Sequence, residues 1–207
     1  ENSEDVLNME SVEMCPTIKE AVASSKVVVG PIPLSSDRKN VSAPFGRNNI
    51  DLDEFIVPIK DKTIPDFLRK FEGFPAVEIN WLIYGSGGAK TKVPGTMMER
   101  FKHHSKLEHY LNRHVKSIVD TRKVFNLIGC HEAARIEGYA ADSHGNPIKK
   151  HFREREPQQD VIRINHYAVR SFEEFLEKQN RGRASGTKRT VEMEYFDKYD
   201  LNDLVDM

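Results

Sequence analysis

Three acidic residues between positions 51 and 54 are the side chains of this chain best suited to chemistry. Asp51 and Asp53 are one residue apart, Glu54 follows directly, and apolar residues continue the segment. In an extended backbone, side chains at i and i+2 point to the same face. If the segment ends a strand, Asp51 and Asp53 can therefore converge on one divalent cation, because Mg²⁺ and Mn²⁺ favour oxygen ligands. The alternative is a charged turn, which is the commoner explanation of an isolated Asp-x-Asp.

The composition is that of an ordinary globular protein and argues against several classes of function. The chain has 207 residues, of which 30% are charged and 38% hydrophobic, and its net charge is −1. Because it lacks an overall positive charge, we expect no nucleic-acid partner. Cys15 and Cys130 form neither a CxxC zinc motif nor a disulfide framework. No apolar run is long enough to cross a bilayer, so we expect no transmembrane segment in this chain.

The elements that must position the carboxylates alternate between helices and strands. Residues 76–84 alternate cleanly, with Ile79 and Trp81 on the same face of the expected strand. Ser171 and Glu174 form a capping box that predicts the start of a helix. Strands interleaved with helices predict an α/β domain. Further helices are expected at 63–71 and in part of 97–114, and further strands at 116–119, 123–128, 133–140 and 161–169.

Changes in patterning divide the chain into three parts. Residues 1–48 form a poorly patterned N-terminal segment, and residues 49–184 carry the regular strand and helix patterns of one catalytic domain. Residues 185–207 are expected to be a polar, partly ordered tail. About 50 residues precede the acidic motif, which is too short a segment for a complete nucleotide-binding half-sheet.

Other ionisable residues also stand where they could do chemistry. Glu78 precedes a glycine-rich turn and Glu99 follows it, whereas His166 ends an apolar strand. Lys178 and Arg181 lie on the helix that follows this strand. Four further histidines do not match a known zinc-ligand spacing, so we expect them to be solvated helix residues. They are His103, His104, His109 and His114.

Taken in order, four motifs resemble a known family. They are Asp-x-Asp-Glu-Phe at 51–55, Ile-Asn-Trp ahead of Tyr-Gly-Ser-Gly-Gly at 79–88, Ile-Asn-His-Tyr at 164–167, and Lys-x-x-Arg-Gly at 178–182. Their order resembles that of the family 2-like and family 92-like glycosyltransferases of the GT-A fold. The resemblance implies a GT-A-like mixed sheet flanked by helices. It also implies a nucleotide-sugar donor, a glycan or lipid-linked acceptor, a divalent metal (Mn²⁺ or Mg²⁺) and inversion at the anomeric carbon.

The resemblance also assigns roles to individual residues. Asp51 and Asp53 match the metal and diphosphate motif, where the metal would neutralise charge on the departing nucleoside diphosphate. His166 matches a histidine that helps to hold the metal or the diphosphate. Lys178 and Arg181 fit a basic clamp on phosphates. A histidine is also frequent near the position of His131, which implies a donor or acceptor contact there.

An inverting transfer also needs a general base near the acceptor hydroxyl. We rank Glu99 ahead of Glu78, while Glu54 and Asp61 remain alternatives. Trp81 could stack on a sugar, but it shares a face with apolar residues, so core packing is the preferred interpretation.

The length of the chain is the main departure from the family. The nucleotide-binding half that would precede Asp51 is expected to be truncated. A non-catalytic remnant, a carbohydrate-binding module and a metal-dependent phosphohydrolase therefore stay open as alternatives. The expected location is cytoplasmic, with or without membrane association, or the Golgi lumen if the source is eukaryotic.

Overall fold

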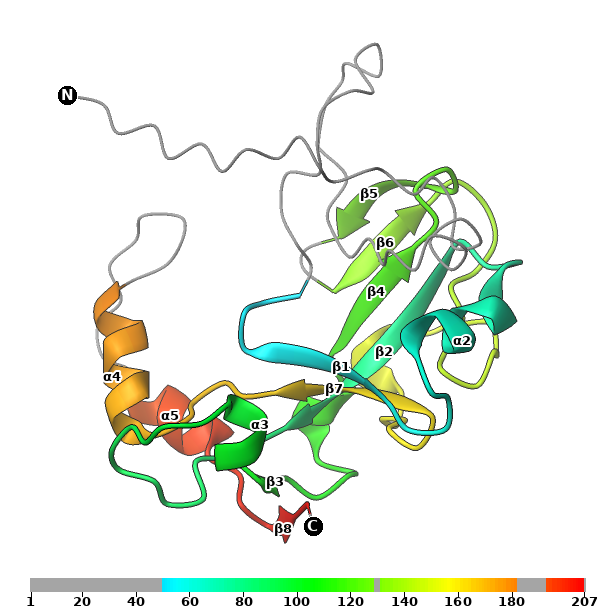
Figure 1. Cartoon of the computed structure of the whole chain (residues 1–207). Coiled ribbons are helices and arrows are strands. Elements are labelled where there is room, and N and C mark those ends of the chain that lie inside the picture. The colour runs from blue at the N-terminus through cyan, green and yellow to red at the C-terminus, as the bar shows by residue number, and fades with distance from the viewer. Residues whose placement is uncertain (1–49, 129–130, 182–192, 207) are drawn as a thin grey trace, which may run out of the picture. The chain divides into compact units, whose positions relative to one another are not determined.

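The computed structural model describes residues 50–128, 131–181 and 193–206 (Figure 1). The predicted N-terminal segment 1–48, Cys130 and Gly182 lie outside the described residues. The chain divides into two compact units. Within the described residues, unit 1 comprises residue 50 together with 62–78 and 116–148, and unit 2 comprises 51–61, 79–115 and 149–206.

The main sheet has four strands in the order β1–β7–β2–β4. β1 runs antiparallel to β7, and β2 runs parallel to it, so the sheet is mixed. Helices flank it, which confirms the predicted α/β class (Figure 1). The elements are β1 (Glu54–Pro58), α2 (Ile64–Leu68), β2 (Ala76–Ile83), α3 (Met97–Arg100), β3 (His103–His104), β4 (Val115–Val119), β5 (Val124–Ile128), β6 (Glu132–Arg135), β7 (Ile162–His166), α4 (Phe172–Arg181), α5 (Met193–Tyr199) and β8 (Leu204–Val205), with 3₁₀ turns at Arg69–Phe71, Tyr110–Arg113 and Phe152–Glu154.

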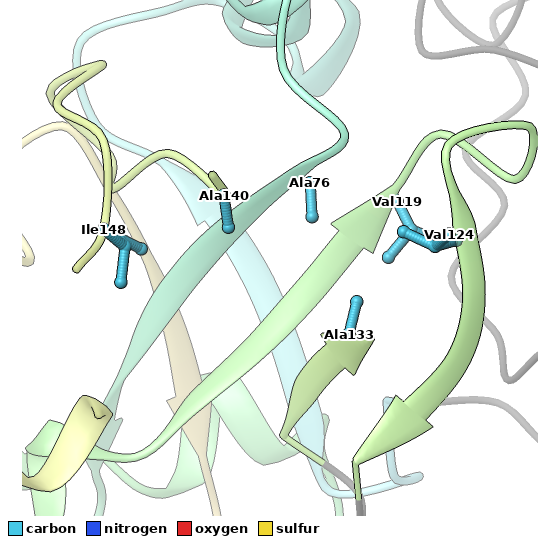
Figure 2. Close-up of a cluster of buried hydrophobic side chains, with 6 residues drawn as sticks. All are labelled: Ala76, Val119, Val124, Ala133, Ala140 and Ile148. Atoms are coloured by element: carbon cyan, nitrogen blue, oxygen red, sulfur yellow. The ribbon is translucent and has the colours of Figure 1, made fainter. Parts of the chain in front are cut away.

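Unit 1 packs a hairpin against the first part of β2. β5 and β6 pair antiparallel, and β6 is shorter than the strand expected at 133–140. Small and β-branched side chains fill the space between these strands, which allows their backbones to approach closely. Figure 2 shows the buried cluster, which consists of Ala76, Val119, Val124, Ala133, Ala140 and Ile148.

Unit 2 has an aromatic core on one face of the sheet. Leu82 and Tyr84 on β2 pack with Phe101 and Tyr167. Phe55 of β1 meets Tyr167 edge to face, with 5.7 Å between the ring centroids. Aromatic pairs prefer such geometry over a face-to-face sandwich. This core therefore fixes β1, β2 and the end of β7 to one another.

The predicted strand at 76–84 is confirmed, but it is buried along its whole length. Its polar residues consequently need partners inside the protein. Asn80 supplies an example, because its amide nitrogen donates to the carbonyls of Asn112 and Arg113. Trp81 is 6% exposed and stacks on His114 at 4.9 Å and 15°, so its core role is confirmed.

The helix predictions hold where a cap is present. Thr63 caps α2 by accepting from the backbone N–H of Asp66, and Pro65 lies in the first turn, as expected. The prediction of solvated helical histidines is wrong. His103 and His104 form β3, and His104 is buried, while His114 packs on Trp81 as described.

Residues 193–206 lie within the polar, partly ordered tail predicted at 185–207, and they include α5 and β8. Phe196 on α5 packs edge-on against Phe172 and Phe175 of α4, and Figure 1 shows the two helices side by side. β8 pairs with β3. Apolar residues spaced three and four apart, Tyr195, Phe196 and Tyr199, carried this helical signal in the sequence.

The loop between α5 and β8 closes over the glycine turn that follows β2. Asp200 accepts from the backbone N–H of Ser86, and Asn202 accepts from that of Gly87. At Gly85 there is no room for a side chain, because a Cβ would lie against the amide of Asn202 and 2.5 Å from the carbonyl oxygen of Leu201.

We therefore expect Gly85→Ala to lower the free energy of unfolding by about 1–3 kcal/mol, as overpacking commonly does. Urea denaturation followed by circular dichroism measures this loss. Gly73→Ala is the matched control, since nothing lies within 4 Å of a Cβ there. Equal stability of both variants would show that the contact between this loop and the glycine turn is loose.

Candidate active site

The acidic motif forms a turn that precedes a strand, which corrects the expected strand end. The backbone N–H of Glu54 donates to the carbonyl of Asp51, and the Glu54 carboxylate accepts from the N–H of Asp51. β1 begins only at Glu54. Asp51 is exposed in this turn, whereas Asp53 is 7% exposed. The two aspartates therefore do not share one face of a strand, and their environments differ sharply.

Asp53 and Lys178 form a largely buried ion pair. The ammonium of Lys178 lies 2.5 Å from Oδ2 of Asp53 and also donates to the carbonyl of Ala168 at 3.1 Å. The side chain of Asp53 is 10% exposed, and that of Lys178 is 21% exposed. Burial raises the pKa of Asp53, but the positive charges of Lys178 and His166 outweigh it, so the net pKa lies below the usual range. The carboxyl group of Asp53 is consequently ionised, and Lys178 balances its negative charge.

His166 lies beside this pair. The backbone carbonyl of Asp53 accepts from the N–H of Tyr167, which places the aspartate next to the end of β7. His166 is 6% exposed and stands in register with Glu54 of β1 and Ile83 of β2. Its ring packs against Trp81, with 4.3 Å between centroids. Three predicted residues, Asp53, His166 and Lys178, are thus brought together.

Lys178 owes its position to an ion pair one turn earlier on α4 that the sequence analysis missed. Arg100 of α3 holds Glu174 with two bonds of 2.8 and 2.9 Å, and the hydroxyl of Ser171 donates to the same carboxylate. Burial raises the pKa of Glu174, but these bonds outweigh it and hold the pKa at about 2. Such a paired geometry is specific to arginine. Nothing in the sequence marks Arg100 as the partner of a residue so distant.

The two residues expected to serve as general base are Glu99 of α3 and Glu78 of β2. Glu99 is exposed and completes a capping box with Thr96, accepting from both its backbone N–H and its hydroxyl. The hydrogen bonds to Thr96 lower the pKa of Glu99, which is the opposite of what a base near neutral pH needs. Glu78 is 1% exposed in β2 and belongs to unit 1. The role of general base stays a prediction for both residues.

The other two predicted binding residues are Arg181 and His131. Arg181 ends α4 and is exposed, three residues beyond Lys178 and hence on the same side of the helix. His131 belongs to unit 1, where its backbone carbonyl accepts from the hydroxyl of Ser117.

Asp53 is the buried carboxylate of the acidic motif, and it is the residue to test as a ligand of a divalent cation. Among the described residues, no three histidine, cysteine, aspartate or glutamate side chains lie close enough to hold a metal by themselves. The link between Asp53 and His166 is electrostatic, since the charge of His166 lowers the pKa of Asp53. Mg²⁺ is commonly held by one or two protein groups together with waters and phosphates. Asp51 is exposed, and its backbone N–H donates to the carboxylate of Glu54.

The model of glycosyltransferase family 92 matches residues 48–201. The chain therefore belongs to glycosyltransferase family 92, and it carries a glycosyltransferase domain. The match extends beyond residue 184, where the domain was expected to end, and includes α5. Searches of the curated proteins and of the solved structures found no match.

One further finding bears on the partners. No helix among the described residues is both long and apolar enough to cross a membrane. Membership of the family implies a nucleotide-sugar donor and a glycan acceptor in general terms.

Proposed function

We propose that this chain transfers a sugar from a nucleotide-sugar donor to a glycan or lipid-linked hydroxyl, with inversion at the anomeric carbon. The observation that carries the proposal is the buried Asp53–Lys178 pair beside His166 in a chain of this family. These three groups would face the diphosphate of the donor, where negative charge develops as the glycosidic bond breaks.

Each group has a distinct task in this proposal. Lys178 supplies an ammonium that can donate to the oxygens of a departing diphosphate. Arg181, on the same side of α4, adds a second positive charge to this clamp. The Arg100–Glu174 pair holds the helix in place, so that the ammonium needs little reorganisation.

Asp53 and His166 are the residues that would hold Mn²⁺ or Mg²⁺. A bound divalent cation would supply Lewis-acid stabilisation of the leaving group. The low pKa of Asp53 keeps its carboxylate charged throughout the physiological range, so that it needs no deprotonation before binding.

Calorimetric titration with a panel of UDP- and GDP-sugars in the presence of Mn²⁺ tests the proposal. At least one donor is expected to bind with a Kd between about 1 μM and 1 mM, the usual range for enzyme substrates. The double variant Asp51→Ala, Asp53→Ala should abolish that binding.

Two outcomes would contradict the proposal. If no nucleotide sugar binds the wild-type chain, the transferase activity of this chain fails, and a non-catalytic role becomes the better interpretation. If binding survives in the double variant, the assignment of the acidic motif to the donor site fails.

A further inference from the structure

The ammonium of Lys178 occupies one oxygen of the carboxylate that a divalent cation would use. It contacts Oδ2 of Asp53 at 2.5 Å, and Asp53 is the buried carboxylate of the acidic motif. Two cations on the same carboxylate repel each other strongly where the dielectric constant is low. A metal can therefore bind Asp53 tightly only if the ammonium moves away.

The side chain of Lys178 can rotate to another position, whereas the backbone of Asp53 is fixed by a hydrogen bond. The lysine carries a flexible four-carbon stem and is 21% exposed, and it lies in the last turn of α4. Asp53 is fixed, because its backbone carbonyl accepts from the N–H of Tyr167 at 2.8 Å. His166 belongs to β7, where it pairs in register with Glu54. A change of cation at this site therefore requires rotation of one side chain and no change in the sheet.

A diphosphate would give the displaced ammonium a new partner. Lysine binds phosphate as a mobile point charge. In the free protein, Asp53 balances the positive charge of the Lys178 ammonium. When a nucleotide is bound, phosphate oxygens can balance it instead.

We propose that Lys178 is an exchangeable cation, which neutralises Asp53 in the free protein and passes to the donor diphosphate when a divalent metal takes its place. The proposal rests on the proposed function in treating Asp53 as the metal and diphosphate site. Metal binding should therefore depend on the nucleotide. A metal ion alone competes with Lys178 for the Asp53 carboxylate, whereas in the presence of nucleotide the ammonium binds phosphate and no longer competes. Binding of either one should then favour the other.

Titration with Mn²⁺ alone, followed by electron paramagnetic resonance, tests the exchange without any nucleotide. We expect Lys178→Met to bind Mn²⁺ about tenfold more tightly than the wild type, a change equivalent to about 1.4 kcal/mol. Lys92→Met is the matched control, because it removes the same charge from an exposed lysine on a surface loop. The double variant Asp53→Asn, Lys178→Met should lose the gain.

A second measurement uses the wild-type chain and does not depend on the folding of a variant. Lysine acetylation read by mass spectrometry should show faster modification of Lys178 when Mg²⁺ alone is added, and protection again with Mg²⁺ and UDP or GDP. Lys90, which is exposed, serves as the internal reference.

The exchange is overturned if Lys178→Met binds Mn²⁺ no more tightly than Lys92→Met, or if Mg²⁺ leaves the acetylation of Lys178 unchanged. These results are separable from the proposed function. A chain that shows the exchange with metal alone but binds no nucleotide sugar retains the cation site and loses the transferase assignment.

Discussion

Replacing Asp53 with asparagine is expected to lower the rate of sugar transfer by about 100- to 1,000-fold, the loss typical of removing one electrostatic contact to a developing negative charge. The amide keeps the size of the side chain but cannot hold a divalent cation as a carboxylate does. It also leaves the ammonium of Lys178 without its anionic partner. Release of nucleoside diphosphate, measured with the donor identified by calorimetry, gives the rate.

Asp160→Asn is the matched control for this variant. Asp160 is an exposed aspartate of the same unit that pairs with Lys60, and its side chain is 54% exposed. Its loss should leave the transfer rate within about twofold, since exposed pairs contribute little. Circular dichroism should show both variants folded. Full activity of a folded Asp53→Asn protein would exclude the carboxylate from the chemistry.

The sequence predicted those parts of the fold that local patterns control. Thr63 and Pro65 mark the start of α2, and the alternation through 76–84 marks β2, because capping and alternation act within a few residues. The acidic motif was harder to predict. A turn and a strand end can both carry Asp-x-Asp, and here the hydrogen bonds between Asp51 and Glu54 favour the turn.

Single motifs do not predict which side chains pair when they are far apart in the sequence. The sequence suggested Lys178 as a phosphate ligand and Asp53 as a metal ligand, but not that the two would pair across 125 residues. Glu99 is different, since Thr96 and Glu99 carry the spacing of a capping box, and that signal was available in the sequence. A capping residue is engaged by its own helix, which makes it a poor candidate for a base.

Acid is expected to weaken the anchoring of α4 through Glu174, because its carboxylate has a pKa of about 2 in the folded protein and an ordinary value of 4.5. A pKa lowered by folding means that the charged form stabilises the fold. This contribution is complete above about pH 4.5 and is lost as the pH falls towards 2. We therefore expect Glu174→Gln to lower the free energy of unfolding at pH 7 by about 3 kcal/mol, the cost of breaking a buried ion pair.

Urea denaturation at pH 7, 4.5 and 2.5 measures this effect. The difference between the wild type and Glu174→Gln should be smaller at pH 4.5 and smaller again at pH 2.5. Over this range the unfolded wild type takes up a proton at Glu174, whereas the folded protein still holds the carboxylate charged. Glu177→Gln is the control on the same helix; its side chain is 60% exposed, and the nearest nitrogen of Lys92 lies 4.0 Å away. It should change the free energy by less than about 0.5 kcal/mol at every pH. A difference for Glu174→Gln that stays constant with pH would mean that packing, and not the charge held by Arg100, fixes the helix that carries Lys178.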